Sequence, residues 1–475
     1  MVAWQREGGE VVPILASVTT RAQGVVIMAG LCYPCGQYVV LSNDAHRHTI
    51  TILRQEIAFM TTTQRRVVIT GLGVISGLGL DADSTWEGML AGRTGAGRIT
   101  DYDPSNLPTQ IVVAVKGFDP RNYMDRRDAR RLGRVTHLAA AAVQEALADS
   151  GLDLEKVDRT RAGVEMGSAF GALDFVESQA CAIQERGPRA INPAKAPAVL
   201  ITTTPCYLGI RYGLQGPANS PVAACATGVV SIGEADRRIQ RGEADVMLAG
   251  GTDSYMTPLI MSAFSRLGAM STRNDEPETA CRPFDLTRDG MIMGEGAAAL
   301  VMESLEHALA RGANILAEYG GMGFTLDAYN MAAPHPEGDG AARAMTRALA
   351  EAGLPPEAID YISAHGTGTK LNDVSETRAM KKALGEHAYR VPAPSIKPMV
   401  GHAMGASGAF GVFTIIKAIQ TGWIPPTINY HVPDPECDLD YAPNHARQHH
   451  VDVGMANAFG FGGQNGSIII KRYEP

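Results

Sequence analysis

One internal repetition constrains the fold of this chain more than any other feature. The run Cys225-Ala-Thr-Gly, continuing to Ile239-Gln-Arg-Gly, lines up at an offset of 180 residues with Gly405-Ala-Ser-Gly, continuing to Ile419-Gln-Thr-Gly. Both runs are typical of helices that begin among small residues and end at a glycine. The repetition predicts two similar βα halves with a boundary near residue 315. Their small-residue helix starts are expected to approach closely at the centre of the molecule.

Apolar strands and helices alternate along the rest of the chain. Strands are predicted at residues 65–73, 162–167 and 245–251, and helices at 125–150 and 225–241. Apolar strands without alternation, flanked by helices, indicate a buried sheet of an α/β protein. The sequence therefore predicts a largely parallel central sheet.

Composition limits the class of protein. The 475 residues are 45% hydrophobic and 19% charged, which is typical of a soluble globular protein. The net charge of −8 argues against nucleic-acid binding. No apolar run reaches the length of roughly 18–20 residues that a membrane span needs. Residues 1–62 are interpreted as an N-terminal extension of uncertain order.

The cysteines are spaced like reduced thiols. Their number is odd at 7 and their spacing irregular, which is typical of a cytoplasmic protein without disulfides. Cys32 and Cys35 form a CxxC pair, but no second pair or ligand set follows. We therefore expect no metal site.

Cys225 is the first candidate for chemistry. It opens a predicted helix, where the positive end of the helix dipole lowers the pKa of a thiol and favours the thiolate. That position suits an acyl-accepting nucleophile. A buried structural cysteine fits the local sequence equally well.

Two histidines in glycine-rich loops favour the catalytic interpretation. His365 lies in Ala364-His-Gly-Thr-Gly-Thr, and His402 ends the run that begins at Lys397. With Cys225 they form a Cys-His-His set, and neither histidine has the spacing of a zinc site.

From residue 64 to the C-terminus the sequence resembles elongating β-ketoacyl-acyl-carrier-protein synthases and is close to type II polyketide ketosynthases. The motifs that carry the resemblance are Arg65-to-Gly73, Ala224-Cys-Ala-Thr-Gly, Cys281-Arg-Pro-Phe-Asp with Arg288-Asp-Gly, the two histidine motifs, and Asn457-Ala-Phe-Gly-Phe-Gly-Gly. The resemblance implies a thiolase-like fold, in which two βαβαβαββ halves form a five-layer α-β-α-β-α sandwich. The halves would span residues 63–315 and 316–475.

The resemblance also assigns catalytic roles. Cys225 would take the growing acyl chain as a thioester, and His365 and His402 would bind the malonyl thioester carbonyl and promote loss of carbon dioxide. Lys397 would support the site electrostatically. The backbone N–H groups of Cys225 and Phe461 would form an oxyanion hole. No cofactor is implied, because the phosphopantetheine arm of an acyl carrier protein carries the substrates.

Further residues follow from the same resemblance. Thr367 and Thr369 would hydrogen-bond the phosphopantetheine arm, and Asp373 and Glu376 would orient the catalytic network. The acyl pocket would include the following aromatic residues: Phe170 and Phe264. Because the family commonly has a smaller aliphatic residue at the position of Phe170, we expect a restricted acyl length. Gly411 replaces the family's glutamate and removes an expected partner of Lys397.

A cluster of basic residues is a candidate docking surface. The basic start of the predicted helix at residues 125–150 carries five arginines, and at helical spacing several of them share one face. Such a face, with Arg126, Arg127, Arg130 and Arg131 as the docking residues, would attract an acidic carrier protein. A solvated helix face, paired with Asp125 and Asp128, is the alternative.

Other readings of the sequence stay open or are disfavoured. Fatty-acid and polyketide pathways are not separated by these motifs, and either a homodimer or a heterodimer with a related subunit is compatible. A non-catalytic chain-length subunit is disfavoured because Cys225, His365 and His402 are present. A thiolase is disfavoured because the late cysteine, Cys437, lacks a Cys-x-Gly context.

Overall fold

The computed structural model describes residues 65–475 and, as backbone, residues 3–7, 10–14, 21–22, 25–32 and 37–42. The chain divides into two units, residues 1–64 and 65–475. In the first unit β1 (Ala3–Glu7) pairs antiparallel with β2 (Glu10–Ile14), and β3 (Arg21–Ala22), β4 (Val25–Cys32) and β5 (Gln37–Ser42) form a second antiparallel sheet. Otherwise the predicted extension, including the side chains of the Cys32–Cys35 pair, lies outside the described residues.

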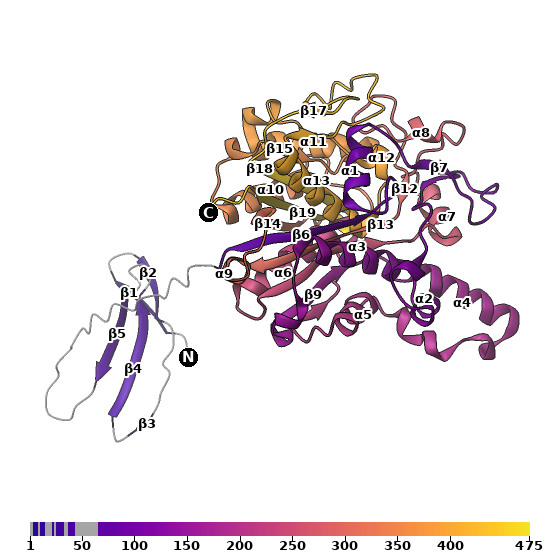
Figure 1. Cartoon of the computed structure of the whole chain (residues 1–475). Helices are drawn as coiled ribbons and strands as arrows, with labels where there is room; N and C mark the ends of the chain where they lie inside the picture. Colours follow the sequence, from indigo (N-terminus) through magenta and orange to yellow (C-terminus); the bar gives the residue numbers. More distant parts are fainter. Residues whose placement is uncertain (1–2, 8–9, 15–20, 23–24, 33–36, 43–64) are drawn as a thin grey trace. The chain divides into compact units, whose positions relative to one another are not determined.

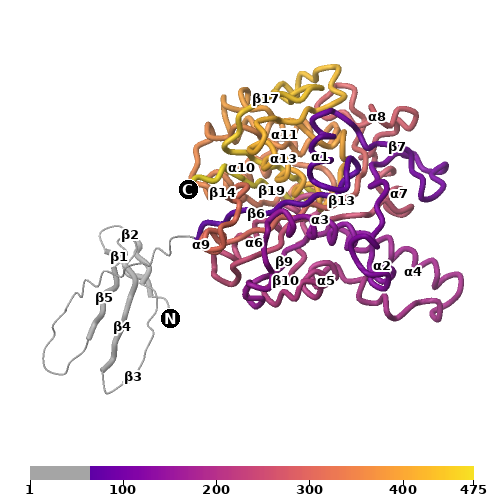
Figure 2. Tube along the Cα trace, in the orientation of Figure 1, coloured from indigo at the N-terminus to yellow at the C-terminus, as the bar shows by residue number. Residues whose placement is uncertain are grey.

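The second unit is built on a central sheet with the order β10-β9-β11-β13-β6-β14-β19-β18-β15. Its N-terminal strands are β6 (Val67–Ile75), β9 (Ala162–Gly167), β10 (Ala218–Asn219), β11 (Val246–Asp253) and β13 (Gly296–Ser304). Its C-terminal strands are β14 (Ala317–Leu326), β15 (Tyr361–Ser363), β18 (Val453–Gly460) and β19 (Gln464–Lys471). In Figure 2 the trace of β6 runs between the N-terminal half, in magenta, and the C-terminal half, in orange to yellow.

Strand order repeats in the two halves. From the centre outward, β6, β13, β11 and β9 follow the same sequence of antiparallel, antiparallel and parallel pairings as β14, β19, β18 and β15. The halves join where β14 pairs antiparallel with β6. This topology confirms the predicted duplication.

The prediction of a largely parallel sheet was wrong. Parallel pairing is limited to β10–β9, β9–β11 and β15–β18, and the other ladders of the sheet are antiparallel. Helices cover both faces of the sheet, so its antiparallel strands are as continuously apolar as parallel ones. Hydrophobic pattern alone cannot distinguish the two directions in such strands.

Helices form layers around the two half-sheets (Figure 1). The outer helices α3 (Arg134–Ser150) and α5 (Thr203–Tyr212) pack on the N-terminal half, and α10 (Asp339–Ala352) and α11 (Lys370–Leu384) pack on the C-terminal half. Between the half-sheets lie α6 (Thr227–Gln240) and α13 (Ser407–Thr421), the two helices of the sequence repetition. The predicted five-layer order is therefore present.

The two central helices touch backbone to backbone. A Cβ atom on Gly228 would lie 2.7 Å from the backbone N of Ala409, and one on Gly408 would lie 2.8 Å from the backbone N of Val229. Real side chains do not come so close, so glycine is required at both positions. The close approach predicted for the small-residue helix starts is confirmed.

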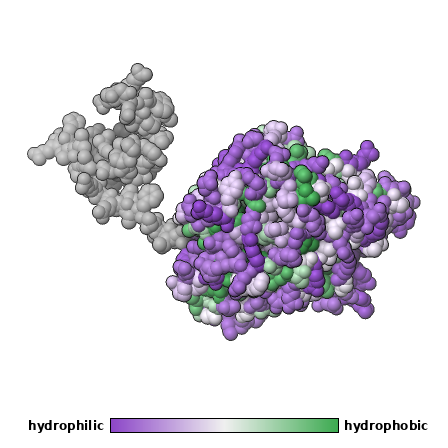
Figure 3. Space-filling model, turned by 90° about the horizontal axis from the view of Figure 1, so that it is seen from above, coloured by the Kyte–Doolittle hydropathy of each residue, from purple (hydrophilic) through white to green (hydrophobic). Residues whose placement is uncertain are grey.

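The remaining elements surround this frame. The helices are α1 (Ala82–Leu90), α2 (Arg126–Arg131), α4 (Leu173–Arg186), α7 (Pro258–Arg266), α8 (Pro277–Ala280), α9 (Leu305–Ala310) and α12 (Lys397–Val400). The short strands are β7 (Ala96–Arg98), β8 (Ile111–Val113), β12 (Met293–Gly294), β16 (Trp423–Ile424) and β17 (Arg447–Gln448). Among the described residues no helix has the length and apolar character of a membrane span. The face seen in Figure 3 is mostly hydrophilic, with small separate hydrophobic areas.

Candidate active site

Cys225 lies on a tight turn that leads into α6. Residues 224–226 form a 3₁₀ turn, and Ala224 has a φ of 48°, a left-handed backbone conformation that residues other than glycine rarely adopt. The equivalent turn at residues 404–406 of the other half repeats this strain at Met404, whose φ is 41°. Cys225 itself is 2% exposed. The duplication therefore extends to a strained backbone at the centre of the molecule, a feature often found at functional sites.

His402 faces the thiol with a defined nitrogen. Its Nε2 atom lies 3.1 Å from Sγ of Cys225, and its Nδ1 atom accepts a hydrogen bond from the backbone N–H of Met404 at 3.2 Å. Because that backbone group can only donate, Nδ1 must be an acceptor, and the proton of the neutral ring lies on Nε2. The hydroxyl of Ser407, 3.0 Å from Nδ1, adds a second contact on the same side. His402 thus presents an N–H donor toward the cysteine.

His365 lies beside His402 and is held in the same way. The two ring centroids are 5.4 Å apart, and Nζ of Lys397 lies 3.4 Å from Nδ1 of His365 and also donates to its carbonyl oxygen. An ammonium group can only donate, so Nδ1 of His365 accepts and its Nε2 carries the proton. Burial, followed by the charge of Lys397, holds the pKa of each histidine well below its usual value. Both rings are therefore neutral donors at physiological pH.

The expected thiolate is not found in the resting site. Burial raises the pKa of Cys225 to about 12, although Lys397 and the backbone N–H of Phe461 act in the opposite direction. The sequence-based expectation considered only the helix start, whereas desolvation of a fully buried thiol is the larger effect here. Cys225 rests as a thiol.

The same cysteine and histidines also form the kind of cluster that can hold a metal. One ligand atom from each of Cys225, His365 and His402 lies within 4.8 Å of the others. However, both Nδ1 atoms accept hydrogen bonds, which places protons on the Nε2 atoms rather than lone pairs. The arrangement therefore suits stabilisation of negative charge better than metal ligation, and the absence of a metal requirement remains a prediction.

Glu376 fixes the loop that carries His365. Its carboxylate accepts the backbone N–H groups of His365 and Gly366, each at 2.7 Å, and it is fully buried. Burial raises its pKa to about 7. Burial lowers the pKa of Lys397, and Glu376 is the strongest of the charges that oppose this effect. Of the neighbouring charges, Glu376 therefore favours the charged form of Lys397 most.

Gly411 occupies a tight position in this structure. A Cβ atom there would lie 3.0 Å from Cβ of Ala456 and 3.3 Å from Oγ of Ser363. The position is already tight for a methyl group in this chain, and no longer side chain fits without movement of its neighbours.

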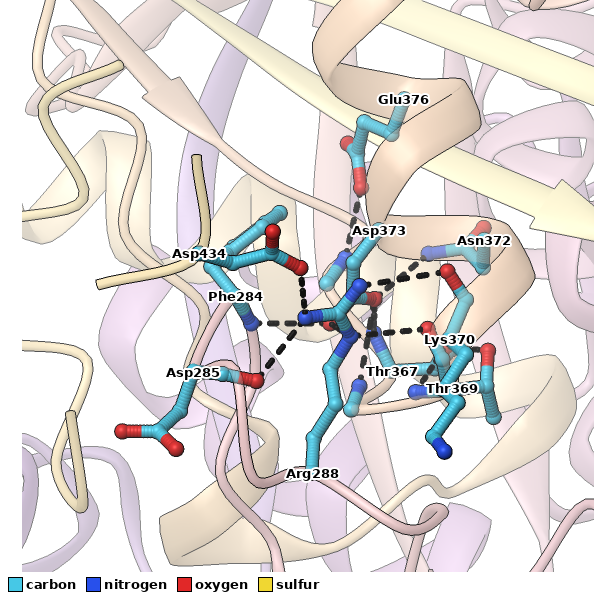
Figure 4. Close-up of polar contacts among 12 residues, drawn as sticks. Phe284, Asp285, Arg288, Thr367, Thr369, Lys370, Asn372, Asp373, Glu376 and Asp434 are labelled. Atoms are coloured by element: carbon cyan, nitrogen blue, oxygen red, sulfur yellow. Dashed lines mark hydrogen bonds and ion pairs between the residues drawn. The ribbon is translucent and has the colours of Figure 1, made fainter. Parts of the chain in front are cut away.

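Asp373 fixes the next part of the same loop (Figure 4). It accepts the backbone N–H groups of Thr367 at 3.1 Å and Gly368 at 3.2 Å, and it lies 3.4 Å from Nε of Arg288. Arg288, 3% exposed, also pairs with Asp434 at 2.6 Å. This gives a structural reason for the Arg288-Asp-Gly motif, whose contribution the sequence did not reveal.

A cavity of about 480 Å³ opens onto the reactive atoms. Its lining includes Cys225, both histidines, Thr367, Thr369 and Phe461. The hydroxyls of the two threonines lie 2.8 Å apart and form one polar patch on the wall. A Cβ atom on Gly460 would lie 3.0 Å from the backbone N of Cys225, so glycine is needed where the 459–463 loop passes the nucleophile.

Phe170 and Phe264 pack against an apolar cluster that includes Cys225. Phe170 stacks on Tyr255 at 5.0 Å, contacts Phe264 edge-on at 6.3 Å, and Phe264 contacts Phe461 at 5.4 Å. Neither phenylalanine lines the open cavity. The space in which an acyl chain was expected is filled by side chains.

The basic cluster of α2 forms a separate surface. Arg126, Arg127 and Arg130 are exposed and Arg131 is half-buried. A surface cleft of about 960 Å³ includes Arg127, Arg130, Arg131 and Lys195 in its lining. Arg134, in the same basic stretch, instead forms an ion pair with the buried Glu295 at 2.6 Å, which is a structural rather than a docking interaction.

One buried carboxylate was missed by sequence reasoning. Asp253, at the end of β11, accepts hydrogen bonds from the backbone N–H groups of Ala169 at 2.9 Å and Gly405 at 2.7 Å, and from the hydroxyl of Ser168 at 2.6 Å. Burial raises its pKa to about 6. It joins the loop that carries Phe170 to the start of α13. The feature of the sequence that could have identified Asp253 is an acidic residue at the end of a predicted apolar strand.

A buried thiol between two neutral imidazole donors, at the junction of duplicated halves with a thiolase-like fold, defines the class of thioester-condensing enzymes. The chain matches "Beta-ketoacyl synthase, N-terminal domain" over residues 64–308 and "Beta-ketoacyl synthase, C-terminal domain" over residues 316–431. It belongs to the β-ketoacyl synthase family.

Named relatives and solved structures support the same family assignment. The chain is 45% identical to the 3-oxoacyl-[acyl-carrier-protein] synthase 2 of Coxiella burnetii, over 86% of this chain and 99% of that protein. It is similar to a structure of a type II PKS acyl-carrier protein in complex with its ketosynthase, with 31% identity, a TM-score of 0.80, and coverage of 86% and 100%. The ishigamide ketosynthase/chain length factor matches with 35% identity, a TM-score of 0.81 and the same coverage.

Proposed function

We propose that this chain is an elongating β-ketoacyl-acyl-carrier-protein synthase. It condenses malonyl-acyl-carrier protein with an acyl chain held on Cys225 and extends that chain by two carbons in fatty-acid biosynthesis. The observation that carries the proposal is the pair of neutral Nε2–H donors, on His365 and His402, that converge on one buried thiol.

The first half-reaction transfers the acyl chain. Sulfur of Cys225 attacks the carbonyl of the acyl thioester, a new C–S bond forms, and the C–S bond to the carrier arm breaks. The thiol proton of Cys225 passes to the departing arm thiolate, so no external base is consumed. The backbone N–H groups of Phe461 and Cys225 both favour negative charge at the thiol, which supports their proposed role as the oxyanion hole for the acyl carbonyl.

The second half-reaction is the condensation. The malonyl arm enters the cavity, and its polar atoms meet the hydroxyls of Thr367 and Thr369. The C–C bond to the carboxylate breaks, carbon dioxide leaves, and the electron pair moves onto the thioester as an enolate. The Nε2–H groups of His365 and His402 stabilise the enolate oxygen, and two such donors are worth several kcal/mol. The carbanion attacks the acyl carbonyl, and Cys225 leaves as a thiolate that takes one proton from solvent.

The cluster of Arg126, Arg127, Arg130 and Arg131 would dock the acidic carrier protein. A carrier protein is present with its ketosynthase in one similar structure, and three exposed arginines of α2, with the half-buried Arg131, lie beside a cleft. No cofactor enters either half-reaction.

Pairing of two subunits would follow from the exposed edge of the sheet. β10 (Ala218–Asn219) ends the sheet with both residues exposed, and Ile210 on α5 is 81% exposed. An open edge beside apolar side chains favours pairing with another chain. A dimer in light scattering of the pure chain would support self-pairing, whereas a monomer that binds only a related subunit would support a heterodimer.

A carrier-protein assay tests the proposed activity. Purified protein is incubated with acyl and malonyl carriers, and carbon dioxide release and the mass of the carrier-bound product are measured. We expect a β-ketoacyl product from wild type and none from Cys225→Ser. The variant Cys206→Ser, which changes an exposed cysteine, is the control. Failure of wild type to form product with any acyl chain would contradict the proposal.

Ketosynthase action in a type II polyketide system is the second candidate, because two similar structures belong to such systems or carry a chain length factor. Repeated condensation distinguishes the pathways. A fatty-acid enzyme without reductases stops after one condensation on a saturated chain, whereas a polyketide enzyme takes the β-keto product back and extends it again.

A further inference from the structure

Tyr255 connects the apolar cluster behind Cys225 to a catalytic histidine. Its side chain is fully buried, and its hydroxyl donates a hydrogen bond to the backbone carbonyl of His402. The same carbonyl also accepts the backbone N–H of Gly294 at 3.0 Å. Burial raises the pKa of Tyr255 well above its usual value, so the hydroxyl keeps its proton.

The ring of Tyr255 is also part of the wall that an acyl chain would meet. It stacks on Phe170 with 5.0 Å between ring centroids, and both belong to the cluster around Cys225. The open cavity reaches the thiol past Thr367 and Phe461 and borders this cluster at Met291, but neither Tyr255 nor Phe170 is part of its lining. An acyl chain that extends from Cys225 toward Tyr255 has to displace side chains of this cluster.

The cluster contains side chains that differ in their freedom to move. Met261, Met270 and Met291 are unbranched and adapt to a ligand by rotation. Tyr255 is restrained by the hydrogen bond from its hydroxyl to the carbonyl of His402. Phe170 is restrained on two sides, by the ring of Tyr255 and by a hydrogen bond from its backbone N–H to Asp253 at 3.2 Å.

We propose that Tyr255 is the specificity-determining residue that limits acyl length, and that its hydrogen bond to His402 couples occupancy of the acyl pocket to the position of that histidine. This inference rests on the proposed condensing function. A chain long enough to push the ring of Tyr255 would disturb the carbonyl of His402. Long chains would therefore lower kcat of the condensation as well as the rate of acyl transfer.

A chemical probe tests the length limit without any carrier protein. Alkyl methanethiosulfonates of increasing length react with a thiol to form a mixed disulfide and release methanesulfinate. Labelling of Cys225 is followed by intact mass and peptide mapping, which separates it from the exposed Cys181 and Cys206. We expect a steep fall in the labelling rate of wild-type Cys225 beyond a limiting chain length.

Two substitutions separate the roles of ring and hydroxyl. Tyr255→Ala removes the ring and is expected to move the limit to chains longer by about four carbons, because the cavity left behind accepts methylene groups. Tyr255→Phe keeps the ring, so the limit should stay, while kcat of condensation on short chains falls about threefold to tenfold with KM unchanged. Tyr361→Phe, at another fully buried tyrosine whose hydroxyl contacts Thr414 at 3.1 Å, is the matched control.

The outcomes distinguish the inference from the function on which it rests. An unchanged limit in Tyr255→Ala, or wild-type labelling that is equally fast for the longest probes, would overturn the length assignment. If Tyr255→Ala does not fold, the wild-type limit and the kcat of Tyr255→Phe decide the question, and a kcat equal to wild type refutes the coupling. Normal probe behaviour without condensation by wild type would instead contradict the proposed function alone.

Discussion

Replacement of Glu376 by glutamine should separate the two half-reactions. The carboxylate accepts two backbone N–H groups, from His365 and Gly366, each at 2.7 Å in a fully buried site. The amide of glutamine has one acceptor oxygen, so its NH₂ group would face the second N–H donor. The variant therefore loses one charge-assisted hydrogen bond and leaves a buried donor unsatisfied.

The magnitude follows from those contacts. An unsatisfied buried donor costs about 1–3 kcal/mol, and each 1.4 kcal/mol is a tenfold change in rate. If the loop relieves this unsatisfied donor by moving His365, the barrier to decarboxylation rises by the same free energy. Decarboxylation of the malonyl carrier should then slow about tenfold to a hundredfold. Acyl transfer to Cys225 should stay within about twofold, because His365 is not required for that step.

Two measurements on the same preparation test this reasoning. Carbon dioxide release from a malonyl carrier gives the decarboxylation rate, and intact mass gives the rate of acylation. Glu165→Gln is the matched control, since Glu165 is also fully buried with a pKa raised to about 7 but contacts Arg238 instead. A decarboxylation rate for Glu376→Gln within twofold of wild type would refute the assignment.

The same substitution predicts a pH dependence. Burial raises the pKa of Glu376 to about 7, and the protonated carboxyl resembles the amide of glutamine. Decarboxylation by wild type should therefore fall toward the rate of the variant as the pH falls below about 7. The rate of the variant should stay nearly flat over that range.

Three further predictions concern stability, packing and docking. Asp236 is fully buried, and burial raises its pKa from 3.8 to about 8, so the folded state loses stability as the pH rises from about 4 through 8. Asp236→Asn should therefore increase the free energy of unfolding by up to about 4 kcal/mol at pH 7 and by little at pH 4, as measured by urea denaturation; equal effects at the two pH values would contradict this. Gly228→Val should prevent soluble expression or lower Tm strongly, because a Cβ atom there meets the backbone of α13 at 2.7 Å; a wild-type Tm would be incompatible with the described packing. Arg127→Glu with Arg130→Glu should raise KM for acyl carriers about tenfold or more at low salt and much less at high salt, with probe labelling of Cys225 unchanged; an unaltered KM would exclude docking on α2.

The sequence contained enough information to predict the duplicated frame and the three groups that converge on the cavity. Small residues repeated at an offset of 180 predicted the close contact of α6 and α13, because glycine at Gly228 and Gly408 is the only residue that permits it. The candidate cysteine and histidines could be predicted because a small-residue helix start and two glycine-rich loops flank them in the sequence.

Other features depend on contacts between segments far apart in the chain. The protonation state of Cys225 is determined by burial in the assembled core, which a helix-start argument does not include. The directions of the antiparallel strands are hidden, because every strand of the sheet core is covered on both faces. Asp253 and Tyr255 act on loops about 85 and 150 residues away along the chain, so no local pattern indicates their partners.

In the proposed mechanism the growing chain is held on Cys225. Incubation with an acyl carrier, followed by intact mass measurement and peptide mapping, locates the acyl group among the seven cysteines of the chain. We predict one added acyl mass, on the peptide that contains Cys225, and its disappearance with release of a β-ketoacyl carrier when the malonyl carrier is added. An acyl group on any other cysteine, or an acyl-Cys225 that persists in the presence of the malonyl carrier, would contradict the account.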